Sequence, residues 1–453
     1  MKKIDIVTIK RNIYKIWNHP GFRKYLANTS WLFMGRVFRM VLGFFVGVWV
    51  ARYLGPDRYG LLSYAQAFVG LFGAIATLGL DGILVREIVK FPEKEGELIG
   101  TSFVLKLIGA FFTLLILAIA INFTSSDQIT KILIFIIASS TIFQSFNIID
   151  IYFQAKVKSK YAVLANIFAF LLGSTFKIYL ILTEAPLIMF GIAILLDSIF
   201  LASWYVFWFF RFIKGKAKSF FRSLSFKADV AFSLLKDSWP LILSSMAIMV
   251  YMKTDQVMIK EMLGTRELGY YSIVVKLTEI WYFIPIIISS SLFPSIINAK
   301  KINKRLYYIR LQKLYTFLFW LALSIALFLT LFGDWLISYI YGCAYTKASP
   351  VLKIYAWVLI FVFFGVASSK WLLNENLQKF SFLRTLYGAC INIFLNLILI
   401  NKYGIVGAAI ATFISQSISG FWFDLFFKKT RISFFLKLKS ILLWRIYDKE
   451  ENL

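Results

Sequence analysis

The residues of this chain whose types suit chemistry are charged side chains inside long apolar segments. Basic residues of this kind, which would attract an anion, are Arg36, Arg39, Lys106, Lys177, Lys253 and Lys276. The acids in comparable positions, which would balance charge or carry a coupling ion, are Asp197, Asp255 and Glu279. Charges are costly in hydrocarbon, so they normally face a protein interior or a wet cavity. The pattern predicts a polar site enclosed within a membrane protein.

The spacing of the charges indicates which of them can pair locally. Lys276 and Glu279 are three residues apart and share a helix face, where they could neutralise each other. Lys253 and Asp255 are two residues apart, point in different directions and need not pair. Each charge alone has a structural explanation, such as an ion pair or a long side chain that reaches the headgroups. Together, the excess of basic residues predicts a water-filled cationic central cavity that selects an anion, with phosphate as the obvious candidate.

Motifs for covalent chemistry are absent from the sequence. It contains no Walker loop, no Gly-x-Ser-x-Gly elbow and no His-Glu-x-x-His motif. The single histidine, His19, lies in a basic N-terminal arm, and the two cysteines are far apart, so a zinc cluster is excluded. The sequence predicts a transporter rather than an enzyme, without a cofactor. A proton or sodium gradient, or mass action, would supply the energy.

Composition places the chain in a membrane. Hydrophobic residues make up 60% of it, whereas soluble domains have about 45–50%. The formal net charge is +27, but the basic residues gather between apolar runs, as topology signals do, which argues against nucleic-acid binding. Their distribution predicts that both termini of this multi-pass protein are cytoplasmic.

The predicted fold class is an all-α polytopic membrane protein. A spanning helix needs about 20 mostly apolar residues, and twelve segments qualify: 29–51, 61–84, 99–122, 129–152, 161–183, 187–210, 239–262, 270–295, 313–333, 350–371, 381–400 and 404–427. We therefore expect two six-helix bundles around a central cavity, with the following parts: a cytoplasmic arm (1–28), an N-terminal bundle (29–210), a basic cytoplasmic linker (211–238), a C-terminal bundle (239–427) and a basic cytoplasmic tail (428–453). The linker and the tail alternate aromatic and basic residues. Each is either an interfacial amphipathic helix on anionic lipid or a solvated basic segment.

A short repeat supports two related halves. Residues 54–63 read Leu-Gly, four residues, Gly, two residues, Ser, and residues 263–272 have the same outline. Apolar runs flank both copies. A repeat of this kind is typical of transporters built from two fused halves.

These motifs resemble a known family. The resemblance rests on residues 28–31 (NTSW), 51–60 (ARYLGPDRYG), 254–258 (TDQVM), 396–400 (NLILI) and 403–412 (YGIVGAAIAT). The chain resembles polysaccharide flippases of the O-antigen and teichoic-acid export type, within the multidrug/oligosaccharidyl-lipid/polysaccharide exporter superfamily. The resemblance implies alternating access and a polyprenyl-pyrophosphate-linked oligosaccharide, such as an O-antigen, lipopolysaccharide or capsule repeat unit, as passenger. It further implies contact with glycan polymerase or ligase machinery, and Arg39, Lys253 and Asp255 are the firmest site residues that it carries over.

Two other functions compete with this interpretation. An ion-coupled multidrug exporter of the same fold would favour an acidic cavity for cationic drugs, which the basic excess disfavours. A membrane glycan polymerase or ligase would need large outer loops, and the predicted outer loops are short. Lipid II flippases of the same superfamily carry two further spans, for which this chain lacks room.

Overall fold

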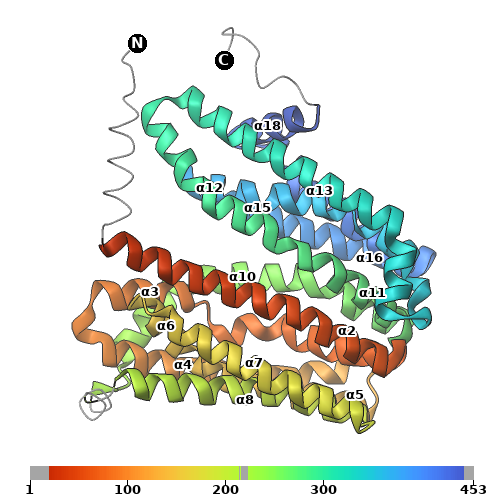
Figure 1. The fold of residues 1–453 in the computed structure, drawn as a ribbon, viewed down its shortest axis with the longest axis horizontal. Coiled ribbons are helices and arrows are strands. Elements are labelled where there is room, and N and C mark those ends of the chain that lie inside the picture. The colour runs from red at the N-terminus through yellow and green to blue at the C-terminus, as the bar shows by residue number, and fades with distance from the viewer. Residues whose placement is uncertain (1–19, 214, 216–222, 443–453) are drawn as a thin grey trace. The chain divides into compact units, whose positions relative to one another are not determined.

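A computed structural model describes residues 20–213, 215 and 223–442, with side chains from residue 28 onward. His19 and the predicted arm up to residue 19, part of the predicted linker (214 and 216–222) and the tail beyond residue 442 lie outside the described residues. Within them the regular secondary structure is helical throughout, which confirms the all-α membrane class (Figure 1).

The helices pack into two compact units. Unit 1 contains the described residues within 1–46, 72–123 and 131–243, and unit 2 contains those within 47–71, 124–130 and 244–453. Unit 2 thus takes two segments from the first half of the chain. The predicted bundle boundaries stay a prediction.

Most helices belong to one unit, and three are shared. The shared helices are α2 (Pro20–Thr77), α10 (Ala228–Leu263) and α5 (Gln128–Gln144), of which residues 128–130 belong to unit 2. Unit 1 has α3 (Asp81–Lys90), α4 (Glu95–Ala120), α6 (Ile148–Ala155), α7 (Ser159–Leu182) and α8 (Leu187–Phe212). Unit 2 has α11 (Thr265–Glu279), α12 (Phe283–Ile302), α13 (Lys304–Tyr341), α14 (Ser349–Tyr355), α15 (Val358–Asn374), α16 (Gln378–Ser417), the π-helix η6 (Ile418–Trp422), α17 (Phe423–Phe426) and α18 (Arg431–Ile441). Short 3₁₀ segments are Pro92–Lys94, Ile121–Phe123, Ser145–Asn147, Ile280–Tyr282 and Cys343–Ala348.

Two of the long helices are broken at a glycine. Helix α2 has 58 residues, which at about 1.5 Å per residue would far exceed a hydrocarbon layer of about 30 Å. It consists of two helices that meet at Gly55, where φ is 69° and ψ is 173°. Helix α16 is divided in the same way at Gly404, where φ is 60°. Positive φ is inexpensive only for glycine. Gly55 lies between two predicted spans, and Gly404 is the first residue of the span predicted over 404–427.

The structure gives a range for the number of membrane spans in the described residues. Eight helices in the described residues are long and apolar enough to cross a membrane, and nine if the pair Cys343–Tyr355 and Val358–Asn374, bent by 50°, forms one span. Helices α2 and α16 each count once in this number although each contains two helices. The count of twelve spans and the cytoplasmic position of both termini stay predictions.

Each unit has its own hydrophobic core. In unit 1, Phe153 and Tyr205 are buried with Leu234 of α10. In unit 2, Phe364 is buried with Phe434 of α18. Helices α7 and α8 lie side by side in unit 1, as α12 and α13 do in unit 2 (Figure 1).

The helix boundaries correct two interpretations of the basic segments. Residues 228–238, assigned to the linker, form the first turns of α10 and pack into the core of unit 1. Residues 431–441 of the tail form α18, and its Phe434 and Lys437 are buried. The solvated alternative is therefore wrong for α18. Its most buried lysine, Lys437, also points into the protein. In an interfacial helix this side chain would instead point to anionic headgroups.

Candidate functional site

Two lysines and one glutamate of unit 2 form the first candidate site, called the lysine cluster here: Lys253 on α10, with Lys276 and Glu279 on α11. Almost every residue of α11 from Leu268 to Thr278 is buried, yet Lys276 is exposed. Its Nζ lies 4.9 Å from the centre of the buried Tyr59 ring, a cation–π contact that helps to hold an ammonium group. An exposed cation within this buried stretch is accessible to a ligand.

The lysine cluster carries a net positive charge. Glu279 acts electrostatically on both Lys253 and Lys276, so two positive charges face one negative charge. Lys253 packs against α2, where a Cβ at Gly70 would lie 3.7 Å from its Cγ. The described residues place no acid in a direct ion pair with Lys253 or Lys276. The local Lys276–Glu279 ion pair considered from sequence spacing is therefore not formed.

A buried carboxylate at Asp255 forms the second candidate site. Asp255 is 5% exposed and accepts hydrogen bonds from Tyr271 Oη (2.7 Å), Thr412 Oγ1 (2.6 Å) and Asn396 Nδ2 (2.6 Å). Asn396 Nδ2 also donates to Asn392 Oδ1 over 3.2 Å. Every one of these donors is uncharged. Because a buried carboxylate is costly without a counter-charge, it normally takes up a proton or binds a cation.

The atoms around Asp255 fit a small hard cation. Asn392, Asn396 and Thr412 bring amide and hydroxyl oxygens beside the carboxylate, and Asn396 Oδ1 is buried without a hydrogen-bond partner among the described residues. Oxygen ligands of this kind are those that hard cations prefer. One carboxylate supplies one negative charge, which suits a proton or a monovalent ion. Both halves of the broken helix α16 are needed, since Asn396 precedes Gly404 and Thr412 follows it.

Arg39 is the centre of the third candidate site, in unit 1. Its Nη1 donates to Asn166 Oδ1 over 2.5 Å, and Asn166 Nδ2 donates to Tyr205 Oη over 2.9 Å. Asp150 and the exposed Arg36 act on it electrostatically without a direct ion pair among the described contacts. A neutral amide thus orients the guanidinium and leaves its charge available for an anion.

The other two predicted cations of unit 1 have acidic partners. Lys106 Nζ lies 2.6 Å from Asp81 Oδ1, with the lysine buried and the Asp81 side chain 63% exposed. Lys177 forms an ion pair with Asp197. A Cβ at Gly173 would lie 1.7 Å from Asp197 Oδ1, so the carboxylate fills the space above that glycine. A substrate role for Lys106 and Lys177 stays a prediction, and these pairs favour the other basic residues as anion contacts.

The Lys177–Asp197 pair leads to a stability prediction. Replacing Lys177 with methionine should destabilise unit 1 by about 2 kcal/mol, because it leaves Asp197 half-buried without its cation. The double variant Lys177→Met with Asp197→Asn should regain most of this loss. Thermal unfolding in detergent micelles measures both. A single variant that melts at the wild-type temperature would show that the pair contributes nothing.

The two copies of the sequence repeat meet within unit 2. A Cβ at Gly60 would lie 1.8 Å from Thr265 O, and a Cβ at Gly269 would lie 2.0 Å from Pro56 O. Residues 54–63 and 263–272 therefore pack backbone against backbone, which only glycine permits at these positions.

Filling this contact should force α2 and α11 apart. We expect Gly60→Ala to lower stability by about 1–3 kcal/mol, since an added methyl group without space displaces the backbone. Gly47→Ala on the same helix is the matched control, because no atom lies within 4 Å of its Cβ position. Melting temperatures of the two variants test the prediction, and equal values would contradict it.

Residues 25–300, more than half of the chain, match the polysaccharide biosynthesis protein family. The chain belongs to this family. Residues 240–398 also match the MatE family.

The chain is also similar to a curated relative, and its fold is similar to those of solved structures. The probable low-salt glycan biosynthesis flippase Agl15 of Haloferax volcanii is 23% identical over 395 residues, which cover 86% of this chain and 80% of the relative. An inward-facing multidrug resistance transporter of the MATE family superposes with a TM-score of 0.70 at 15% identity, covering 90% of this chain and 95% of the other. Lipid II flippase MurJ in an inward closed conformation superposes with a TM-score of 0.67 at 19% identity, covering 90% of each chain. The predicted membership of the exporter superfamily is confirmed.

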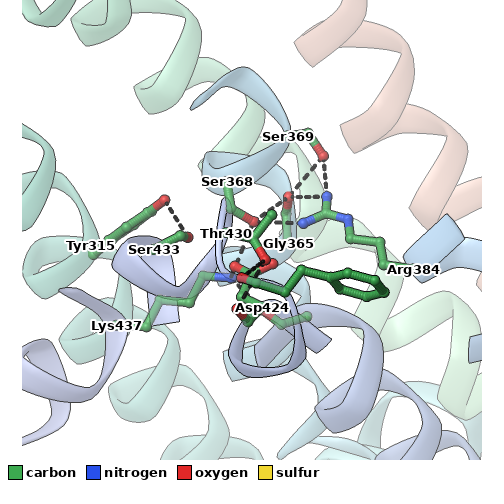
Figure 2. A network of polar contacts seen from close by, with 11 residues as sticks. Tyr315, Gly365, Ser368, Ser369, Arg384, Asp424, Thr430, Ser433 and Lys437 are labelled. Carbon is green, nitrogen blue, oxygen red and sulfur yellow. Dashed lines mark hydrogen bonds and ion pairs between the residues drawn. The ribbon is translucent and has the colours of Figure 1, made fainter. Parts of the chain in front are cut away.

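Sequence reasoning missed a polar network in unit 2. Arg384 on α16 is buried and donates to Ser368 Oγ over 2.7 Å, and Ser368 also accepts from Lys437 of α18 (Figure 2). Lys437 in turn pairs with Asp424. Arg384 lies inside a predicted span, which was a usable signal. Lys437 lies in a run of basic residues, and nothing in that run indicates that it is buried.

Proposed function

We propose that the protein is a flippase that moves lipid-linked glycans across the membrane. The passenger is a polyprenyl-pyrophosphate-linked oligosaccharide repeat unit of the O-antigen or capsule type, translocated by alternating access across a bacterial cytoplasmic membrane. The observation that supports this most is the lysine cluster, where Lys276 is an exposed residue and neither lysine has an acid in direct contact within the described part of the chain. The name of the Haloferax volcanii relative, a glycan biosynthesis flippase, agrees with it.

The basic groups would bind the diphosphate of the passenger. Lysine is a common phosphate-binding residue, and the guanidinium of Arg39 can bind two phosphate oxygens at once. Lys253 and Lys276 are the proposed contacts in unit 2. In unit 1, Arg39 with Arg36 is proposed separately as a second anion-binding group. Lys106 and Lys177 would contribute to binding of the diphosphate through the local electrostatic field of their ion pairs. The polyprenyl tail would remain in lipid.

Asp255 is the proposed coupling group. The carboxylate and the oxygen atoms around it would bind a proton or a sodium ion. This ion would be transported down its gradient as cargo. Glu279 would balance the charge of the lysine cluster, and Asp197 would balance that of Lys177. Contact with glycan polymerase or ligase machinery is proposed as well.

An ion-coupled multidrug exporter is the alternative that the geometry favours less. Lys253, Lys276 and Arg39 have no acid in direct contact among the described residues, so their charge would repel cationic drugs. Enzymes that polymerise or ligate glycans are also less favoured, because the matched relatives and folds are named as flippases or transporters.

Deleting the gene tests the proposed function in cells. We expect a lipid-linked oligosaccharide to accumulate on the cytoplasmic side and surface glycan to disappear, with both restored by the wild-type chain. The Arg39→Gln variant should restore less surface glycan at equal protein abundance. Unchanged surface glycan in the deletion strain, with unchanged lipid-linked intermediates, would contradict the proposal.

A further inference from the structure

The C-terminal helix α18 is fixed on unit 2 by side-chain contacts. It packs on α13 and α17. Gln312 Nε2 of α13 donates to Ser440 Oγ over 3.0 Å. The hydroxyl oxygens of Tyr315 and Ser433 lie 3.3 Å apart (Figure 2). The tail helix is therefore an integral part of the unit.

Lys437 carries the most enclosed charge of this helix. Its side chain is 0% exposed, and its partner Asp424 is 1% exposed. The ammonium group donates to Gly420 O (2.6 Å), Asp424 Oδ2 (2.8 Å) and Ser368 Oγ (3.2 Å), so all three N–H bonds have an acceptor. Figure 2 shows Lys437 with Asp424 and Ser368. Because removing one member of a buried ion pair is strongly destabilising, these contacts tie α18 to α15, η6 and α17.

One acceptor of Lys437 belongs to a π-helix. Gly420 lies in η6 (Ile418–Trp422), directly after α16. A π-turn places an extra residue in the helix and is rare unless its surroundings hold it. Here a Cβ at Gly420 would lie 2.5 Å from Phe361 O, so the turn is pressed against α15. Lys437 supplies the donor that the Gly420 carbonyl needs in this position.

The π-helix is linked to the Asp255 site by two short paths. Ser419 Oγ lies 3.4 Å from the hydroxyl of Tyr251, which stands one helical turn before Asp255 on α10. On α16, Thr412 donates to Asp255, and its carbonyl accepts from Ser415 Oγ over 3.1 Å. The carbonyl of Ser415 in turn accepts from the backbone N–H of Ile418, the first residue of η6. A change in the register of η6 would therefore alter how α16 presents Thr412 to the carboxylate.

We infer that Lys437 is a positioning residue for the Asp255 site. By binding Gly420 and Asp424 it keeps the π-helix in place, and the π-helix sets the alignment of Thr412 with Asp255. The tail helix thereby determines how tightly the site holds its cation. This inference rests on the proposed coupling role of Asp255. The contacts by which Lys437 holds the π-helix, called the clamp here, can be tested without it.

Ion titrations of the purified full chain test the inference. The melting temperature is followed while sodium chloride replaces choline chloride at constant ionic strength, and in a second series while pH is varied. We expect Lys437→Met to shift the titration midpoint by about tenfold or more, as loss of supporting contacts around ligands does elsewhere. Lys439→Met, an exposed lysine two residues along the same helix, should keep the wild-type midpoint. A wild-type midpoint in Lys437→Met overturns the inference.

A double variant covers the case in which Lys437→Met does not fold. Lys437→Met with Asp424→Asn removes both buried charges, so it should fold. The Gly420 carbonyl still lacks its donor, and the midpoint should remain shifted. A double variant with the wild-type midpoint would show that only charge balance matters, which overturns the inference.

Hydrogen exchange separates this inference from the proposed function. Amides of residues 413–422 should exchange several-fold faster in Lys437→Met, or in the double variant, than in wild type or Lys439→Met. If wild type responds to neither sodium nor pH, the coupling role of Asp255 fails, and faster exchange still supports the clamp on the π-helix. Unchanged exchange in this segment overturns the clamp.

Discussion

Replacing both Lys253 and Lys276 with methionine should abolish glycan translocation while the protein still inserts into the membrane. Each lysine would make a hydrogen bond to an ionised phosphate, and such bonds contribute about 1.5–3 kcal/mol each. Losing two of them should lower the translocation rate by roughly 10²–10⁴-fold at sub-saturating passenger. The rate is measured as protected lipid-linked glycan per unit time in vesicles, and in cells as surface glycan at equal protein abundance.

A third lysine serves as the control for this prediction. Lys402 is exposed beside Tyr403 in unit 2, so Lys402→Met removes a charge of the same kind away from the lysine cluster. It should translocate at the wild-type rate. Wild-type translocation by the Lys253 and Lys276 double variant would remove the main support for a phosphate-binding cluster.

Replacing Asp255 with asparagine should uncouple the protein from its ion. Asparagine keeps the shape of the side chain and can still meet Tyr271, Thr412 and Asn396, so the fold should survive. It lacks the negative charge that would hold a proton or a sodium ion. We expect the melting temperature to stop responding to sodium and pH, and gradient-driven translocation to fall by about 100-fold, within the range seen when ligand contacts are lost.

Asp334 provides the matched comparison for Asp255. It is an exposed carboxylate paired with Lys353 over 2.7 Å, and Asp334→Asn should leave the ion response and the translocation rate unchanged. If Asp255→Asn keeps the full sodium or pH response, the coupling site lies elsewhere in the chain.

Several features of the site were predictable because they depend on local sequence. Spacing alone indicates that Lys253 and Asp255 point apart, and in the structure Lys253 packs near Gly70 while Asp255 lies among uncharged donors. The breaks at Gly55 and Gly404 follow from short glycine-containing connections between apolar runs. Such features depend on periodicity and turn chemistry, which a single sequence displays.

Other features depend on partners that lie on distant helices. The partner of Lys106 is Asp81, 25 residues away on α3. The sequence does not indicate that Lys106 is buried or that the exposed Asp81 forms an ion pair with it. The burial of Lys437 depends on Asp424 and the carbonyl of Gly420. Nothing in the basic run itself distinguishes Lys437 from Lys439. Pairing across helices is a tertiary property that composition and spacing do not encode.

The most direct test of a lipid-linked glycan flippase is translocation by the purified protein in sealed vesicles. Polyprenyl-pyrophosphate-linked oligosaccharide in the outer leaflet is exposed to a membrane-impermeant glycosidase, and the protected fraction is followed over time. We predict that wild-type protein increases the protected fraction, and that the Lys253 and Lys276 double variant does not exceed protein-free vesicles. A wild-type fraction equal to that of protein-free vesicles, with and without a proton or sodium gradient, would contradict the account.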